Sequence, residues 1–135
     1  MVFGGRNERD VYLNKVRFGL IGGGFGALIG RVHKMAAELS GSAELVCGAF
    51  SRDSNQSERA GVELFGIDRY RSYPDVETMC LTESAIDEGR RAEVMIVATP
   101  NHSHFEIAKQ CLNSGFHVVC DKPMTVSVHQ AQELA

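Results

Sequence analysis

A glycine-rich segment, residues 22–27 (GGGFGA), has the spacing G-x-G-x-x-A. Gly22 permits a tight turn, Gly24 lets the backbone approach an anion without an intervening side chain, and the small Ala27 allows close packing of a helix on a strand. An apolar run precedes this segment and a helical pattern follows it, so a helix N-terminus would direct free amides at the same anion. The context predicts that the segment, including Phe25 and Gly26, holds a dinucleotide pyrophosphate.

The glycine pattern by itself leaves other interpretations open. A glycine-rich turn without a ligand has the same local sequence, and methyltransferases that use S-adenosylmethionine have a similar loop. No Gly-Lys-Ser/Thr follows, so the segment is not a nucleoside-triphosphatase loop. The stretch from Gly26 to Gly30 is too polar for a pair of membrane helices.

Residues 51–53 (Ser-Arg-Asp) follow the second predicted strand, where the adenosine ribose of a dinucleotide would lie. Ser51 can donate a hydrogen bond, and Arg52 can pair with a ribose 2'-phosphate. Asp53 comes slightly too late in the chain to be the usual acidic ribose ligand. The expected cofactor is therefore NAD(P), with NADP slightly favoured over NAD.

Two further segments could carry chemistry, residues 98–104 (ATPNHSH) and residues 117–123 (HVVCDKP). Oxidation of an alcohol moves a hydride to a nicotinamide and releases a hydroxyl proton, which requires a positioned proton acceptor. A lysine in a partly desolvated cleft can share that proton because burial disfavours its charged form. Lys122 is therefore the catalytic candidate, although a lysine after a strand is more often a surface charge.

At this separation the two segments resemble the Gfo/Idh/MocA family, which includes glucose-fructose oxidoreductase and inositol dehydrogenase. The resemblance covers nearly the whole chain from Val16 onward. It implies that the turn of Thr99, Pro100 and Asn101 lines the nicotinamide side of the cofactor cleft.

The resemblance also implies that Lys122 contacts substrate and nicotinamide, and that a cis peptide precedes Pro123. Asp121 stands where the family usually has glutamate, which keeps the charge but shortens its reach. We therefore include Asp121 among the cofactor-binding candidates. His104 matches a histidine that is frequent in the family and is expected to orient the turn, and His102 is also expected to be structural.

Members of this family have a second α/β domain that binds substrate, mediates oligomers and carries the principal acid/base histidine. The sequence lacks that domain and stops before the sixth strand of the complete dinucleotide fold, so we interpret it as truncated and inactive alone. The expected function is the nucleotide-binding domain of an NAD(P)-dependent oxidoreductase that acts on CH-OH groups of sugars, inositols or related polyols. A binding-only redox sensor is the first alternative and a methyltransferase the second.

The predicted elements around these residues alternate between strand and helix. This order predicts a doubly wound, Rossmann-type parallel α/β sheet in residues 16–135 after a polar arm in residues 1–15. Leu28, Val32, Met35, Ala36 and Leu39 have the helical spacing expected of a helix packed on the sheet. The other predicted helices cover residues 55–64 with Ser54 as cap, 74–88, 104–113, and a last one with a capping box at Ser127 and Gln130. The predicted strands are residues 16–21, 44–50, 70–73, 92–98 and 116–120.

The composition limits the classes of partner that the chain can bind. With 135 residues and 44% hydrophobic content it can build one core, and a net charge of -3 disfavours a nucleic acid or an anionic membrane as partner. No signal peptide or membrane span is visible, so we expect a cytoplasmic protein. The four cysteines are too far apart for a zinc or redox pair and are expected to be free core thiols, and no metal site is expected.

Overall fold

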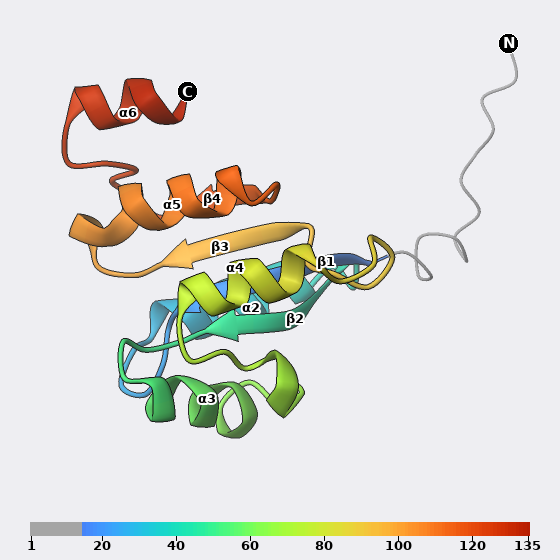
Figure 1. Cartoon of the computed structure of the whole chain (residues 1–135). Helices are drawn as coiled ribbons and strands as arrows, with labels where there is room; N and C mark the ends of the chain where they lie inside the picture. The colour runs from blue at the N-terminus through green and yellow to red at the C-terminus, as the bar shows by residue number, and fades with distance from the viewer. Residues whose placement is uncertain (1–14) are drawn as a thin grey trace, which may run out of the picture.

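The computed structural model describes residues 15–135, which form a four-stranded parallel sheet with helices on both faces (Figure 1). The predicted polar arm therefore lies outside the described residues except for Lys15. The strands are β1 (Val16–Gly22), β2 (Ala43–Ala49), β3 (Val94–Ala98) and β4 (His117–Cys120). Their order across the sheet is β2-β1-β3-β4, which confirms the predicted Rossmann-type α/β fold.

Within these residues each strand is followed by a helix, and two α-helices lie between β2 and β3. They are α2 (Ile29–Glu38), α3 (Ser54–Glu63), α4 (Val76–Ser84), α5 (His104–Asn113) and α6 (Val128–Leu134). Two short 3-10 helices, η1 (Arg69–Arg71) and η2 (Asn101–Ser103), lie between them. Helix α6 extends the layer of α5 at one end of the molecule (Figure 1).

Strand β3 is the centre of the core because it is covered on both faces. Met95 and Val97 belong to a buried cluster with residues of α4 and α5. Ile96 and Ala98 belong to a second cluster on the other face, with residues of α2 and α3 packed against it. The absence of polar alternation in this strand predicts this two-sided burial, and the structure confirms it.

The predicted third strand, residues 70–73, is wrong. Asp68 accepts a hydrogen bond from Tyr70 N at 2.8 Å, which closes the chain into the 3-10 helix η1 instead of extending it. One isolated parallel bridge joins Ser72 to Gly48, and Tyr73 N donates to Gly48 O. Local side-chain capping therefore prevails over the β propensity of the tyrosines.

Helix α2 packs on the sheet, but with a different face from the predicted one. The apolar stripe of Leu28, Val32, Met35, Ala36 and Leu39 is exposed, and Leu39 retains 85% of its accessible surface. The buried residue of the helix is Gly30, with Ala37 partly buried against the core. Small residues face the strands here because the helix approaches them closely.

Two helix starts differ by one or two residues from the prediction. The cap of α3 is Asp53, whose carboxylate accepts from Gln56 N, and not Ser54. Helix α4 begins after Asp75, which caps it by accepting from Thr78 N, and it ends at Ser84 rather than near residue 88. The capping box of α6 is confirmed, because Ser127 Oγ accepts from Gln130 N.

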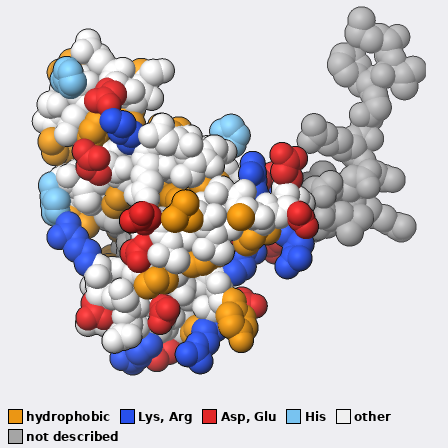
Figure 2. Space-filling view, in the orientation of Figure 1, with side chains coloured by type: hydrophobic (Ala, Val, Ile, Leu, Met, Phe, Trp, Pro, Cys, Tyr) orange, Lys and Arg blue, Asp and Glu red, His pale blue; other side chains and the backbone are white. Residues whose placement is uncertain are grey.

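Acidic and basic side chains are interspersed on the face seen in Figure 2, in keeping with the small net charge. Among residues 15–135, none of the helices has the length and apolar character needed to traverse a bilayer.

Candidate functional site

A cavity of about 270 Å³ opens at the carboxyl ends of the strands, around β1 and its neighbours. The chain passes from β1 to β2 on one side and to β3 on the other, and this reversal of strand order leaves a crevice at that edge. The cavity is lined by eight of the predicted site residues: Gly22, Gly24, Phe25, Ala27, Ser51, Arg52, Thr99 and Pro100. The other four, Gly26, Asn101, Asp121 and Lys122, do not line it.

Gly22 and Gly24 of the loop have no room for a side chain. Gly22 has φ of 88°, and a Cβ atom on it would lie 2.5 Å from the carbonyl oxygen of Ala98. A Cβ atom on Gly24 would lie 2.5 Å from the carbonyl oxygen of Phe50, to which Gly24 N donates a hydrogen bond at 3.1 Å. The loop is thus pressed against the ends of β2 and β3 by its backbone.

Helix α2 packs closely against the glycine loop at Gly30, and not at Ala27, where the loop pattern predicts close packing. A Cβ atom on Gly30 would lie 2.5 Å from the Cα atom of Gly23. Ala27 instead lines the cavity. Because α2 starts only at Ile29, the small residue that permits close packing is Gly30, three positions after the Ala27 of the pattern.

The loop presents unpaired backbone donors. Within residues 15–135, the amides of Phe25 and Gly26 have no hydrogen-bond partner, and Leu28 at the N-cap of α2 makes no side-chain cap. The amino end of α2 therefore adds its partial positive charge to free N–H groups beside the cavity. This arrangement can bind a pyrophosphate.

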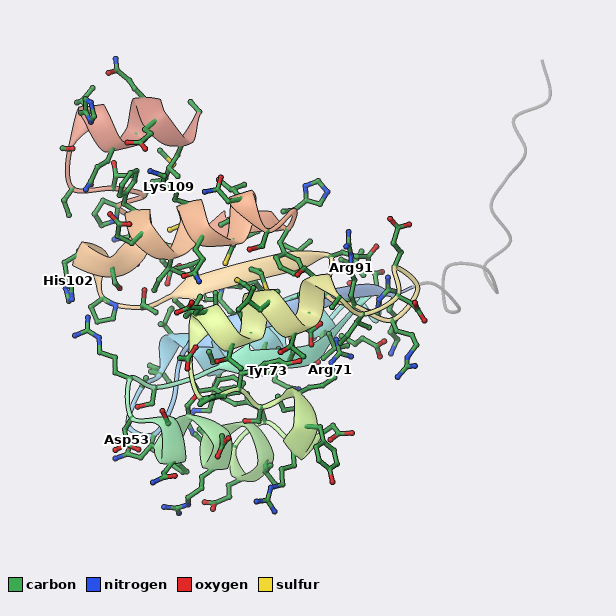
Figure 3. All side chains as sticks on the ribbon, in the orientation of Figure 1. Asp53, Arg71, Tyr73, Arg91, His102 and Lys109 are labelled. Atoms are coloured by element: carbon green, nitrogen blue, oxygen red, sulfur yellow. The ribbon has the colours of Figure 1, made fainter. Side chains whose placement is uncertain are left out.

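Arg52 and Ser51 lie at the second side of the cavity, after β2. The guanidinium Nη2 of Arg52 donates to Nε2 of His102 at 2.6 Å, so the chain after β2 contacts the chain after β3. Asp53 and His102 both lie at the end of the sheet to which the strands point (Figure 3). The Asp53 carboxylate caps α3, and Ser51 Oγ accepts from Asp53 N at 3.1 Å.

The Thr99-Pro100-Asn101 turn leads from β3 into η2. Ser103 Oγ lies 2.8 Å from Thr99 Oγ1 and 2.7 Å from the carbonyl oxygen of Pro100, which fixes the turn internally. Thr99 and Pro100 face the cavity, whereas Asn101 is exposed outside its lining.

His104 is fully buried below this turn. Its Nε2 lies 2.7 Å from the carbonyl oxygen of Thr99, and its Nδ1 lies 2.8 Å from the carbonyl oxygen of Pro123. The ring thus joins the two segments from which the family resemblance is drawn. This is the orienting role expected for His104.

Lys122 lies in the connection between β4 and α6, and the predicted cis peptide between Lys122 and Pro123 is confirmed. Its side chain is exposed, so the residues that the structure describes do not supply the desolvation expected of a catalytic lysine.

Asp121 N donates to Val97 O at 3.0 Å, and Asp121 Oδ1 lies 2.7 Å from His33 Nε2. The contact of His33 with Asp121 was not predicted from the sequence. Its one sequence signal is that His33 lies one turn after Gly30, on the side of α2 that faces the sheet.

The thiols are free, as expected, and three of them, Cys47, Cys80 and Cys111, are buried. Burial and the neighbouring Asp121 raise the pKa of the partly exposed Cys120, so its nucleophilic thiolate is disfavoured. The part of the chain that the structure describes holds no group of three His, Cys, Asp or Glu side chains that could bind a metal ion.

A parallel sheet, a glycine loop pressed against it and open amides at the start of the next helix define a dinucleotide-binding Rossmann domain. Residues 16–135 match the Gfo/Idh/MocA family model, described as an oxidoreductase family with an NAD-binding Rossmann fold. The chain belongs to this family, and NAD is the cofactor of the family domain.

Known relatives include an uncharacterised oxidoreductase of Bacillus subtilis, YfiI, which is 35% identical over 129 residues, 95% of this chain and 32% of the relative. The scyllo-inositol 2-dehydrogenase (NADP(+)) of the same organism is 36% identical over 64 residues, 47% of this chain and 18% of that protein. The crystal structure of an inositol dehydrogenase homolog from Azotobacter vinelandii, complexed with NADH and myo-inositol, has a TM-score of 0.83 and 37% identity. That match covers 90% of this chain and 31% of the other, so the chain spans about a third of these longer proteins.

Proposed function

We propose that residues 16–135 bind a nicotinamide dinucleotide for a dehydrogenase that oxidises CH-OH groups of a sugar, an inositol or a related polyol. The pyrophosphate would lie on residues 22–27, the adenosine ribose at Ser51 and Arg52, and the nicotinamide at residues 99–101. The observation that carries this proposal is the cavity that gathers these three segments at one edge of the sheet.

The residues present fit such a cofactor. The backbone at Gly22 and Gly24 allows an anion to reach the amides of Phe25 and Gly26, which have no partner within residues 15–135. The family match favours this function over the methyltransferase that the glycine loop alone would admit. The polyol class is taken from the inositol named in two of the similar proteins.

The nicotinamide supplies the hydride acceptor when it is bound. This chain's own contribution would be to hold the ring beside the Thr99 turn and to present Lys122 toward a substrate hydroxyl. The Lys122 side chain would orient that hydroxyl, and the acid/base histidine that the family carries in its second domain would accept the hydroxyl proton as the hydride leaves carbon. The proposed partners are thus a dinucleotide and a small polyol rather than a nucleic acid or a membrane, with oligomer contacts in the second domain of longer relatives.

Arg52 supports the proposal that NADP is preferred over NAD. Its guanidinium contacts the imidazole of His102, and it forms no salt bridge within residues 15–135, so its charge is available to a 2'-phosphate. The nearby acidic residue, Asp53, is engaged as a helix cap instead of being free for a ribose hydroxyl.

Titration of the chain with NADH and NADPH, followed by cofactor fluorescence, tests both statements. We expect the chain to bind both cofactors, and NADPH more tightly. The Arg52→Ala variant should lose about tenfold in NADPH affinity, which corresponds to ~1.4 kcal/mol, while its NADH affinity changes little. Arg69→Ala, at an exposed arginine of η1, is the matched control.

Failure of the wild-type chain to bind either dinucleotide would contradict the proposed function. Equal affinity for the two would contradict the NADP preference alone. A binding-only redox sensor predicts the same titration but no role for Lys122, so unchanged dinucleotide affinity in a Lys122→Ala variant of this chain would favour the sensor.

A further inference from the structure

The two residues that flank Lys122 are held by histidines from different elements. Asp121 Oδ1 lies 2.7 Å from Nε2 of His33 on α2, and the carbonyl oxygen of Pro123 lies 2.8 Å from Nδ1 of His104 at the start of α5. Asp121 is also fixed by its backbone amide, which donates to Val97 O. We infer that His33 is a positioning residue for Lys122, an inference that rests on the proposed function.

The contact between His33 and Asp121 differs from an incidental surface pair. The two side chains retain only 25% and 26% of their exposure, and they join positions 88 residues apart in the chain. Nε2–H of the imidazole donates to the carboxylate, a charge-assisted hydrogen bond stronger than one between neutral groups. A freed Asp121 carboxylate would instead be available to the ammonium group of its neighbour Lys122.

The same helix carries the anion site. Gly30, one turn before His33, packs its backbone against Gly23 of the glycine loop, so the helix is fixed to that loop at its amino end. His33 therefore connects a rigid phosphate-binding element to the loop of Lys122. The arrangement aligns Lys122 with the cofactor by a side-chain bridge.

Asp121 in place of glutamate is compatible with this role. The shorter side chain reaches His33 at hydrogen-bond distance, so the carboxylate at this position keeps a partner. Its Oδ1 faces helix α2 and leaves the cavity lining to other residues. The carboxylate acts on the loop of Lys122 and not on the cofactor directly.

The experiment follows Lys122 itself in the full 135-residue chain. The sequence contains four lysines, Lys15, Lys34, Lys109 and Lys122. Reductive methylation with ¹³C-formaldehyde gives one dimethylamine resonance for each of them, and the one missing in Lys122→Arg identifies Lys122. NADH and ADP are the ligands, since ADP reaches the glycine loop but has no nicotinamide.

We expect His33→Ala to move the Lys122 resonance by more than its linewidth and to weaken NADH binding about fivefold, the factor that a hydrogen bond of ~1 kcal/mol provides. ADP affinity should stay within about twofold. His33→Gln retains an N–H donor and should restore the wild-type resonance. His129→Ala, at an exposed histidine of α6, is the matched control.

An unchanged Lys122 resonance in both His33→Ala and Asp121→Asn would overturn the inference. Asp121→Asn alters the same contact from the loop side, so the test survives if one variant does not fold, as judged by circular dichroism. Absence of NADH and ADP binding to the wild-type chain would count against the proposed function, while the resonance would still report on His33.

Discussion

The two ends of the parallel sheet are built on opposite principles. At the carboxyl end, β1 runs into a glycine loop that leaves the amides of Phe25 and Gly26 without partners within residues 15–135. At the amino end, charges are paired, with Arg17 3.1 Å from Glu93. Figure 3 shows Asp53 and His102 at the first end and Arg91, whose carbonyl accepts from Arg17 Nε, at the second.

Glu83 is a fully buried acidic residue on the amino side. Its carboxylate accepts from Arg71 at 2.6 and 2.9 Å, from Tyr73 OH at 2.9 Å and from Ala92 N at 3.1 Å. Burial raises the pKa of Glu83, but these hydrogen bonds outweigh it and leave the pKa below its ordinary value. One end of the sheet therefore leaves backbone donors open, while the other uses its side-chain donors and acceptors to stabilise the fold.

Removal of Glu83 should have the largest effect and should separate the two ends. Glu83→Ala leaves Arg71, Tyr73 OH and Ala92 N without their buried acceptor, and we expect a loss of about 3–5 kcal/mol in the free energy of unfolding, measured with urea. Glu63→Ala, which breaks the exposed pair with Arg59, should cost less than about 1 kcal/mol. Similar costs for the two variants would show that the buried network does not stabilise the fold.

At the carboxyl end of the sheet, a methyl group added to Gly22 should lower both stability and cofactor binding. Gly22→Ala combines a positive φ with a Cβ atom 2.5 Å from a backbone oxygen, and we expect it to cost about 2–4 kcal/mol and to abolish NADH binding. Gly115 has φ of 86° but open space around its Cβ position, so Gly115→Ala should cost only about 1 kcal/mol and leave binding intact. Equal costs would mean that the loop is not pressed against β3.

The lowered pKa of Glu83 predicts a partial loss of stability in acid. A carboxyl whose pKa is lower in the folded than in the unfolded state stabilises the fold above its unfolded pKa, and this contribution disappears as pH falls through the folded pKa. Unfolding free energies measured from pH 6 downward should therefore decline more steeply in the wild-type chain than in Glu83→Gln. Parallel curves would contradict the charged state of Glu83.

The smallest expected effect concerns Asp53, which lies at the site but acts as a helix cap. Asp53→Ala removes the acceptor for Gln56 N, and we expect a cost of about 1 kcal/mol in stability. NADH affinity should stay within about twofold, because the carboxylate is not assigned to the ribose. A large loss of NADH affinity with unchanged stability would instead place Asp53 in the cofactor site.

Much of the fold could be predicted because its signals are local. The helix over residues 104–113 has the predicted bounds, since apolar spacing and the following glycine fix both. The uniform apolar composition of β3 predicts its cover on both faces. The predicted strand at residues 70–73 failed because a capping aspartate, Asp68, favours a turn that propensity does not describe.

Hydrophobic periodicity also misled at α2, where the apolar stripe is exposed and Gly30 faces the sheet. The period of such a pattern indicates a helix but does not say which side the strands approach. Steric fit determines which side of the helix faces the strands. At the position where the backbone of Gly23 lies against the helix, a residue without a Cβ atom is required, and Gly30 meets this requirement.

The amino-acid sequence was enough to predict the family, the glycine loop from Gly22 to Ala27 and the candidate Lys122, because these depend on residue types at short, fixed spacings. The packing of the folded chain was needed to show that Lys122 lies outside the cavity and that His33 and His104 contact the residues on either side of it. These contacts join positions as much as 88 residues apart. Their distances depend on how a helix packs on the sheet, which local residue spacing does not specify.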